Sequence, residues 1–191
     1  MVNGLSYYLR QAWKKPDTET LRKRMIEWRQ GDSVVRVENP LRLDRAHSLG
    51  YKAKKGIFVV RTRVNRGGHV RMRPKKGRMG RRMHTILNLK MNYQQISEQR
   101  ANAKYPNCEV LNSYWIGKDG MNYFYEVILV DRTAPEIKSD RQLSFLTKPA
   151  NSKRIFRGLT SAAAKARGLR NSNFKVPKVR PSLRSHNRQG N

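Results

Sequence analysis

The chain has 191 residues, of which 42 are Lys or Arg and 13 are Asp or Glu, so its formal net charge at neutral pH is +29. This length suits one compact domain with extensions. No Asp or Glu lies between Asp44 and Glu98, and none follows Asp140. Because an ordinary solvated surface mixes both signs of charge, two long acid-free tracts predict contact with a polyanion.

Two classes of protein do not fit this composition. The longest aliphatic run, Val127 to Val130, is far too short to span a bilayer, and the N-terminus lacks the apolar core of a signal peptide. We therefore expect a soluble intracellular protein with no membrane partner. Its single cysteine, Cys108, excludes an internal disulfide and a cysteine-based zinc site. We expect this side chain to be a buried small apolar group rather than a reactive thiol.

The first elements along the chain are predicted to be helices. Asp17 is placed to cap a second helix, and Pro16 ends a first one. Basic residues on the other faces of the second helix are either solvated charges or a polyanion-facing surface. The apolar positions at helical spacing are Leu5, Tyr8, Leu9 and Ala12 or Trp13 in the first helix, and Leu21, Met25 and Trp28 in the second.

A short helix over about Pro40 to Leu49 is predicted next. Asn39 supplies an N-cap, Pro40 suits the first helical position, and Gly50 suits the C-terminal stop.

The stretch from Leu49 to Arg82 joins a strand to cationic segments at both of its ends. Ile57 to Val64 is predicted to be a strand, with Phe58, Val60, Thr62 and Val64 on one face and Arg61 and Arg63 on the other. Lys52, Lys54 and Lys55 precede it. A basic arm at 66–85 follows, with almost no apolar residue to bury, so we expect an anionic partner to order it. Its cations are Arg66, Arg71, Arg73, Lys75, Lys76, Arg78, Arg81 and Arg82.

The middle third is predicted to hold a helix and a hairpin. Asn88 is placed to cap a helix that runs to about Lys104 and ends at Tyr105-Pro106. Two strand-like runs follow, Val110 to Ile116 and Tyr123 to Val130. Because Lys118-Asp119-Gly120 makes a turn between them, an antiparallel hairpin is the economical interpretation.

The last third is predicted to be mostly irregular. Leu143, Phe145 and Leu146 form either a short strand or an anchoring segment. Thr160 or Ser161 is placed to cap a short helix that Gly168 closes. Residues 171–191 have very few apolar side chains, so we expect a basic extended tail.

Catalytic motifs are weak throughout. The four histidines, His47, His69, His84 and His186, lack the spacing of metal ligands, so no metal site is predicted. The glycines at 67, 68, 77 and 80 do not make a phosphate-binding loop. They either let the backbone lie close to a sugar-phosphate surface or simply turn the chain. Glu126 and Asp131 are expected to pair with nearby Arg or Lys rather than to act as catalytic groups.

Five motifs in this order resemble the "fifteen-e" family of large-subunit ribosomal proteins of archaea and eukaryotes, and the resemblance extends from the N-terminal helix to about Leu169. They are Leu49-Gly50-Tyr51-Lys52-Ala53-Lys54, Arg63-Val64-Asn65-Arg66-Gly67-Gly68, Val110-Leu111-Asn112-Ser113-Tyr114-Trp115, Phe124-Tyr125-Glu126-Val127-Ile128-Leu129-Val130-Asp131 and Arg157-Gly158-Leu159-Thr160-Ser161.

This resemblance implies an α+β fold with a small, mainly antiparallel sheet, packed helices, and long basic extensions threaded into large-subunit rRNA. It implies neighbouring ribosomal proteins as further partners, a cytoplasmic place in the ribosome, and no enzyme activity, cofactor or small-molecule substrate. Together with the composition, we expect a single domain over 1–170 that includes the basic arm, followed by the tail over 171–191. A free-standing chromatin or RNA-chaperone protein and an RNA-processing enzyme remain alternatives. The predicted rRNA contacts are Lys52, Lys54, Lys55, Arg61, Arg63, Arg66, Gly67, Gly68, Arg71, Arg73, Lys75, Lys76, Arg78, Arg81, Arg82, Arg157, Lys165, Arg167 and Arg170.

Overall fold

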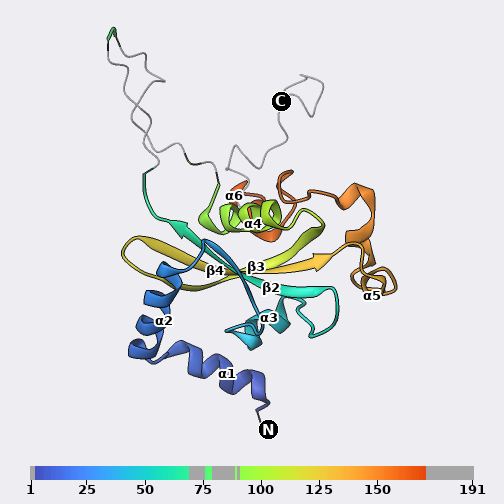
Figure 1. Ribbon diagram of the computed structural model, residues 1–191, viewed down its shortest axis with the longest axis horizontal. Coiled ribbons are helices and arrows are strands. Elements are labelled where there is room, and N and C mark those ends of the chain that lie inside the picture. The colour runs from blue at the N-terminus through green and yellow to red at the C-terminus, as the bar shows by residue number, and fades with distance from the viewer. Residues whose placement is uncertain (1–2, 69–75, 79–88, 90, 171–191) are drawn as a thin grey trace.

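The computed structural model of the protein describes residues 3–68, 76–78, 89 and 91–170. A four-stranded sheet lies at its centre (Figure 1). Every pairing in it is antiparallel, and the order β1-β2-β4-β3 places β1 and β3 at the edges. The strands are β1 Val34–Val37, β2 Ile57–Asn65, β3 Cys108–Lys118 and β4 Asn122–Asp131.

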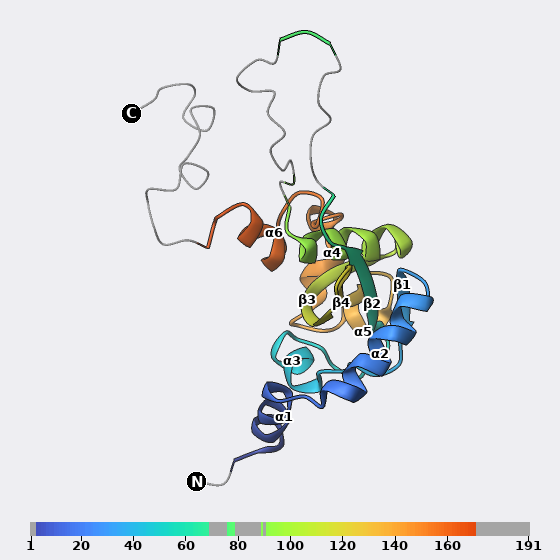
Figure 2. The ribbon, with the colours of Figure 1, turned by 90° about the vertical axis from the view of Figure 1, so that its left-hand side faces the viewer.

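Helices cover both faces of this sheet, which confirms the predicted α+β class. Figure 2 shows α2 and α3 on one side of the strands and α4 and α6 on the other, while α1 extends from the α3 side. The helices are α1 Leu5–Lys14, α2 Thr18–Gln30, α3 Leu43–Ser48, α4 Tyr93–Lys104, α5 Pro135–Lys138 and α6 Ser161–Ala166.

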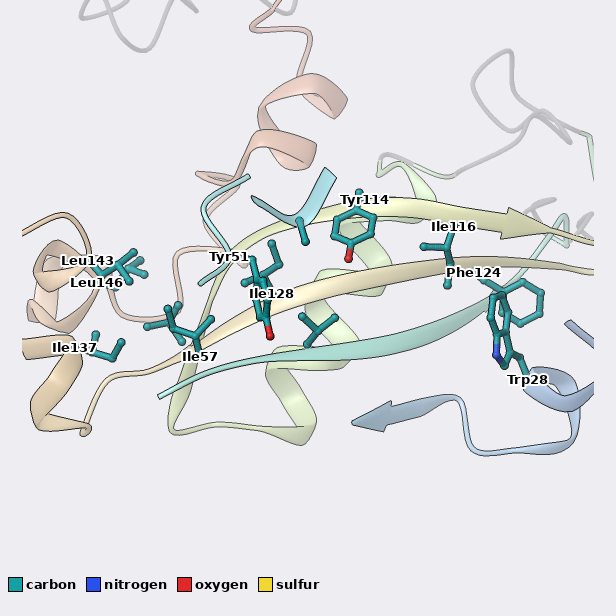
Figure 3. Close-up of a cluster of buried hydrophobic side chains, with 13 residues drawn as sticks. Trp28, Tyr51, Ile57, Tyr114, Ile116, Phe124, Ile128, Ile137, Leu143 and Leu146 are labelled. Carbon is teal, nitrogen blue, oxygen red and sulfur yellow. The ribbon is translucent and has the colours of Figure 1, made fainter. Parts of the chain in front are cut away.

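A first hydrophobic core lies between the sheet and the segments on the α2 and α3 side. Figure 3 shows Trp28 of α2 beside Phe124 of β4, and their ring centroids are 5.3 Å apart with an edge-on arrangement. Ile128 continues this core along β4, and Ile137 of α5 closes its far end. An edge-on aromatic pair adds directional stabilisation to the burial of apolar area.

A second core fills the other face. Val60 of β2, Val110 of β3 and Val127 of β4 are fully buried there against Ala101 of α4. The methyl side chain of Ala101 lets the helix lie close to the β-branched residues of the strands. Both sheet faces are therefore buried, which explains the nearly unbroken burial along β4.

Several predicted elements are confirmed by the structure. The Asp17 carboxylate accepts hydrogen bonds from the backbone N–H groups of Glu19 and Thr20 at the start of α2. The Thr160 hydroxyl accepts one from the Ala163 N–H at the start of α6. β2 alternates as expected, and Cys108 is buried.

The predicted hairpin is also present, formed by β3 and β4. The Asp119 carboxylate fixes its turn by accepting hydrogen bonds from the backbone N–H groups of Met121 at 2.8 Å and Asn122 at 2.5 Å.

The predicted helix start at Pro40 is wrong, because α3 begins only at Leu43. The Leu41 N–H instead donates to both carboxylate oxygens of Glu126 on β4, at 3.1 and 3.2 Å. This contact with the sheet holds the segment before α3 out of the helix.

Two further predictions need correction, and one strand was not predicted. α4 begins at Tyr93, with the Asn92 side chain accepting the Gln95 N–H, so Asn88 (outside the described residues) is not its cap. The strand alternative for 143–146 is wrong: Leu143 and Leu146 anchor a 3-10 turn in the first core. β1 was not predicted, because four residues at a sheet edge give too short an alternation to recognise.

Most of the basic arm at 66–85 and all of the tail at 171–191 lie outside the described residues. Within the part of the chain that is described, no helix combines the length and apolar character needed to cross a membrane.

Candidate nucleic-acid interface

Burial of acidic side chains makes the surface more positive than the net charge suggests. Four of the 13 acidic residues have almost no solvent exposure: Asp44, Glu98, Glu109 and Glu126. The fold largely covers these four side chains, so few of their carboxylate oxygens lie on the surface that a polyanion would contact. The surface available to a polyanion is therefore depleted of carboxylates beyond what the composition indicates.

In the lysine cluster before β2, two lysines contact other described residues of the protein and one does not. Lys54 Nζ lies 2.6 Å from Asp140 Oδ2, and this bond lowers the pKa of the Asp140 carboxyl. Lys52 Nζ donates to Gln142 Oε1 at 3.3 Å. Lys55 is exposed and forms no ion pair or hydrogen bond with the described residues through its side chain. Lys55 is thus the lysine here with the most freedom to meet a phosphate.

Arg61 and Arg63 lie on the sheet face that carries α2. The Arg61 guanidinium carbon is 5.0 Å from the Trp28 ring centroid, and burial lowers the pKa of this arginine. Arg63 Nη1 donates to the backbone carbonyl of Arg29 at the end of α2. Both side chains therefore hold α2 against β2, whatever else they contact.

The end of β2 is the base of the basic arm, and it is held firmly. Arg66 Nη1 donates to the Asp119 carbonyl at 2.6 Å, and its guanidinium carbon lies 5.1 Å from the Tyr123 ring centroid. The Gly67 N–H donates to the Tyr93 hydroxyl at 3.0 Å. The hairpin turn and the start of α4 together fix the direction in which the chain leaves the sheet.

The arm glycines that the structure describes serve at least one of the two predicted roles. Gly67 and Gly68 both have φ of +73°, and Gly77 has φ of +88°, so all three turn the chain in a conformation that favours glycine. A Cβ at any of these positions would meet nothing within 4 Å among the described atoms. Gly80 lies outside the described residues.

The cations around α6 also divide into two groups. Arg157 Nη2 donates to the Ser152 carbonyl at 3.0 Å, and Arg167 Nη1 donates to the Gly158 carbonyl at 3.2 Å, so both brace the loop before α6. Lys165 and Arg170 are exposed, and their side chains form no hydrogen bond or ion pair with the described part of the chain. These two side chains are therefore accessible to a partner.

β2 separates the two basic segments that adjoin in sequence. It has nine residues, so the lysines before Ile57 and the arm after Asn65 lie about 30 Å apart. The base of the arm is instead near α6, because Asn92 Nδ2 donates to the Ala162 carbonyl at 2.9 Å. α6 lies on the same side of the sheet as α4 (Figures 1 and 2).

Of the remaining predicted contacts, the structure describes only two. Lys76 and Arg78 are described and exposed. Five others lie outside the described residues: Arg71, Arg73, Lys75, Arg81 and Arg82.

The carboxylates considered for catalysis are bound within the fold. The Glu126 carboxylate accepts the Leu41 N–H, and burial raises the pKa of its carboxyl. Asp131 accepts hydrogen bonds from the Thr133 N–H and hydroxyl at 2.9 and 2.7 Å. Neither carboxylate forms the expected ion pair with an Arg or Lys among the described residues. Arg61 does lie opposite Glu126 in the register of β2 and β4. In the described ranges no three His, Cys, Asp or Glu side chains form a metal site.

Arginines with structural roles were not evident from sequence pattern. Arg154 Nη1 donates to the Val110 carbonyl at 3.1 Å, and Arg132 Nη1 donates to the Ser152 hydroxyl at 3.0 Å. Burial lowers the pKa of Arg154. Their partners lie 20 to 44 residues away in sequence, so no local spacing could have identified them.

Known proteins resemble this chain over nearly its whole length. A family profile described as Ribosomal L15 matches residues 4–186. The chain belongs to this L15e family. The fifteen-e resemblance carried by the five motifs is thereby confirmed.

Three similar relatives carry the name large ribosomal subunit protein eL15. The one from Picrophilus torridus is 48% identical over 185 positions, covering 94% of this chain and 95% of the relative. The one from Methanocorpusculum labreanum is 48% identical over 198 positions, and the one from Methanocella arvoryzae is 45% identical over 195 positions. Both alignments cover 100% of each chain.

Proposed function

We propose that this protein is a structural constituent of the large ribosomal subunit and stabilises folded large-subunit rRNA through its Arg- and Lys-rich segments. The observation that carries the proposal is full-length similarity to large ribosomal subunit proteins eL15. As a ribosomal constituent the protein works in the cytoplasm, performs no catalytic step, and has rRNA and neighbouring ribosomal proteins as partners.

The binding mechanism is electrostatic and follows from the charge distribution. Lys and Arg side chains neutralise phosphates where rRNA strands crowd together, which releases condensed counterions. Planar guanidinium groups bridge phosphates of separate strands or stack on unpaired bases. The burial of four carboxylates supports this mechanism, because it leaves fewer negative charges to repel the RNA backbone.

Within this proposal the predicted contacts divide by the surroundings of each side chain. Exposed cations without protein partners among the described residues are assigned to rRNA first, together with the arm. They are Lys55, Lys76, Arg78, Lys165 and Arg170. Arg61 and Arg63 are assigned mainly to holding α2 on the sheet, and Lys54, Arg157 and Arg167 to bracing loops, with rRNA contact secondary.

Each rival function has a distinguishing observation. A free-standing chromatin or RNA-chaperone protein would be present away from ribosomes and stable alone at low ionic strength. An RNA-processing enzyme would turn over RNA in a manner abolished by changes at Glu126, Asp131 or His84. The surroundings of Glu126 and Asp131 argue against the enzyme, since both carboxylates already accept hydrogen bonds from the protein.

The test is quantitative mass spectrometry of particles purified from translating cells, combined with crosslinking mapped on the rRNA. We expect one copy per mature large subunit, retained in polysomes, with crosslinks to large-subunit rRNA from the arm and from α6. Presence in subunit precursors alone would instead identify an assembly factor. Absence from mature large subunits would overturn the proposal.

A further inference from the structure

A pocket at the edge of the sheet, outside the basic arm, has the chemistry of a nucleotide-binding site. It has a volume of about 610 Å³, within the range of about 300 to 1,000 Å³ typical of sites for small ligands. Its walls come from α1, α3, α4 and β3, so only the tertiary fold assembles it. The lining residues that matter most are Arg10, Arg42, Arg45, Gln94, Ser113 and Trp115.

The charge of this pocket favours an anion. Among the described residues three arginines line it, and Asp44 is the only acidic one there. Asp44 Oδ2 lies 3.9 Å from Arg42 Nη2, so the carboxylate is directed to the least exposed of the three guanidinium groups. Arg10 and Arg45 are exposed and form no ion pair within the described residues. These two positive charges are left for a phosphate group.

An aromatic platform lies beside these charges. Trp115 has 40% of its surface exposed although it sits within edge strand β3, between the buried residues Tyr114 and Ile116. A part-exposed tryptophan that lines the same pocket as three arginines suits stacking of a base, which is the common mode by which proteins hold unpaired nucleotides. The neighbouring Arg42 is held 4.7 Å from the Trp13 ring centroid, so the wall of the site is preorganised.

A protein strand is a poor occupant of this edge. Outward carbonyls of β3 already accept hydrogen bonds from side chains: Ser113 O from Gln94 Nε2 at 2.9 Å, and Trp115 O from Arg42 Nη1 at 3.5 Å. The Val110 carbonyl is occupied in the same way by Arg154. Side chains therefore cover the edge that an added strand would pair with.

We propose that this pocket binds a single unstacked nucleotide of large-subunit rRNA, with its base on Trp115 and its phosphate between Arg10 and Arg45. The inference rests on the proposed ribosomal function and adds a specific binding site to it. The other source of the same chemistry is a free nucleotide. RNA is favoured because the pocket is open at the surface and the whole chain is strongly cationic.

The test measures binding of the full chain to transcribed large-subunit rRNA for Trp115→Ala and for the double variant Arg10→Ala/Arg45→Ala. Phe156→Ala is the aromatic control, because Phe156 is 52% exposed and lies at a different surface pocket. Lys138→Ala/Arg141→Ala is the charge-matched control. Trp115→Tyr should bind rRNA more tightly than Trp115→Ala, close to the wild type, if the role of the indole is stacking. Circular dichroism checks that each variant is folded.

We expect Trp115→Ala to weaken binding about tenfold, as removal of one stacked base does, and Phe156→Ala to leave it unchanged. The double arginine variant should weaken binding and lower the salt slope by about two, more than its control. Ultraviolet crosslinking in wild-type complexes should map Trp115 to a single nucleotide.

Two outcomes would overturn this inference. One is rRNA affinity in Trp115→Ala and Arg10→Ala/Arg45→Ala equal to that of their controls, while the wild type still binds. The other is saturable binding of adenosine monophosphate at Trp115 with no rRNA crosslink there. A wild-type chain with no preference for large-subunit rRNA would instead count against the proposed function itself.

Discussion

Thr160 Oγ1 donates a 2.6 Å hydrogen bond to Glu98 Oε2, which ties the start of α6 to the middle of α4. The Ser113 hydroxyl of β3 donates to the other carboxylate oxygen, so one fully buried side chain joins three elements. Burial raises the pKa of the Glu98 carboxyl, and the hydrogen bonds from Ser113 and Thr160 act in the opposite direction.

We therefore expect Glu98→Ala and Glu98→Gln to differ in stability. The alanine variant leaves two buried hydroxyls without their acceptor and opens a cavity, so unfolding free energy should fall by about 2 to 4 kcal/mol. Glutamine keeps the shape and one acceptor oxygen, and it avoids burying a charge. Its unfolding free energy near neutral pH should be close to that of the wild type, as measured by urea denaturation in moderate salt.

The raised pKa of Glu98 also gives a predicted pH dependence. Because the folded state holds this proton more tightly than the unfolded state, the contribution of Glu98 to stability is fully present below the ordinary pKa of 4.5. It is lost as pH rises through the raised folded-state value. The stability of Glu98→Gln relative to the wild type should thus increase as pH rises above 4.5. A constant difference between the two across that range would contradict this assignment.

Gly56→Ala should destabilise the junction between β2 and α5. Gly56 has φ of +84°, and an added Cβ would lie 2.8 Å from Ile137 Cγ1 and 2.9 Å from Ala134 Cβ. Backbone strain and overpacking together should lower the unfolding free energy by roughly 2 to 4 kcal/mol. Gly120→Ala is the matched control, because nothing lies within 4 Å of its added Cβ. Equal thermal shifts in the two variants would refute the role of this contact.

Replacing four arm arginines together should weaken RNA binding. With six to ten phosphate contacts, wild-type affinity for large-subunit rRNA should fall by roughly a thousandfold or more between about 50 and 200 mM salt. The variant with Arg71, Arg73, Arg78 and Arg81 changed to Ala should bind more weakly, with a flatter dependence on salt. Filter binding across a salt series measures both effects.

The control for the arm variant removes the same charge elsewhere, by changing Lys138, Arg141, Lys148 and Lys153 to Ala. All four are exposed on the body. A salt slope in the arm variant as steep as in this control would show that the arm is not part of the RNA-binding surface.

Arg61 and Lys55 should respond differently to substitution by alanine. Arg61 packs over Trp28, so Arg61→Ala should lower the unfolding free energy by about 1 to 2 kcal/mol and leave the salt slope of rRNA binding nearly unchanged. Lys55 is exposed, so Lys55→Ala should leave stability unchanged and lower the slope by about one. A lower salt slope for Arg61→Ala together with an unchanged slope for Lys55→Ala would instead place Arg61 in the rRNA interface and exclude Lys55 from it.

The confirmed predictions depend on features a few residues apart. Asp17 caps a helix that starts at the next residue, Thr160 bonds an N–H three residues on, and Asp119 closes a two-strand turn within its own loop. The errors have the opposite origin. The start of α3 was displaced because Leu41 bonds Glu126, 85 residues away.

The sequence alone determined the excess of positive charge, its acid-free tracts, the hairpin, the helix caps Asp17 and Thr160 and the family, because composition, local spacing and ordered motifs can be seen along a chain. Only the tertiary structure decided which carboxylates are buried, which arginines brace the body, and that β2 holds two adjoining basic segments about 30 Å apart. It also brought Arg10, Arg45 and Trp115 to one pocket. The physical reason is that burial and side-chain partners depend on contacts between residues far apart in sequence, and the sheet forms those contacts only when the chain folds.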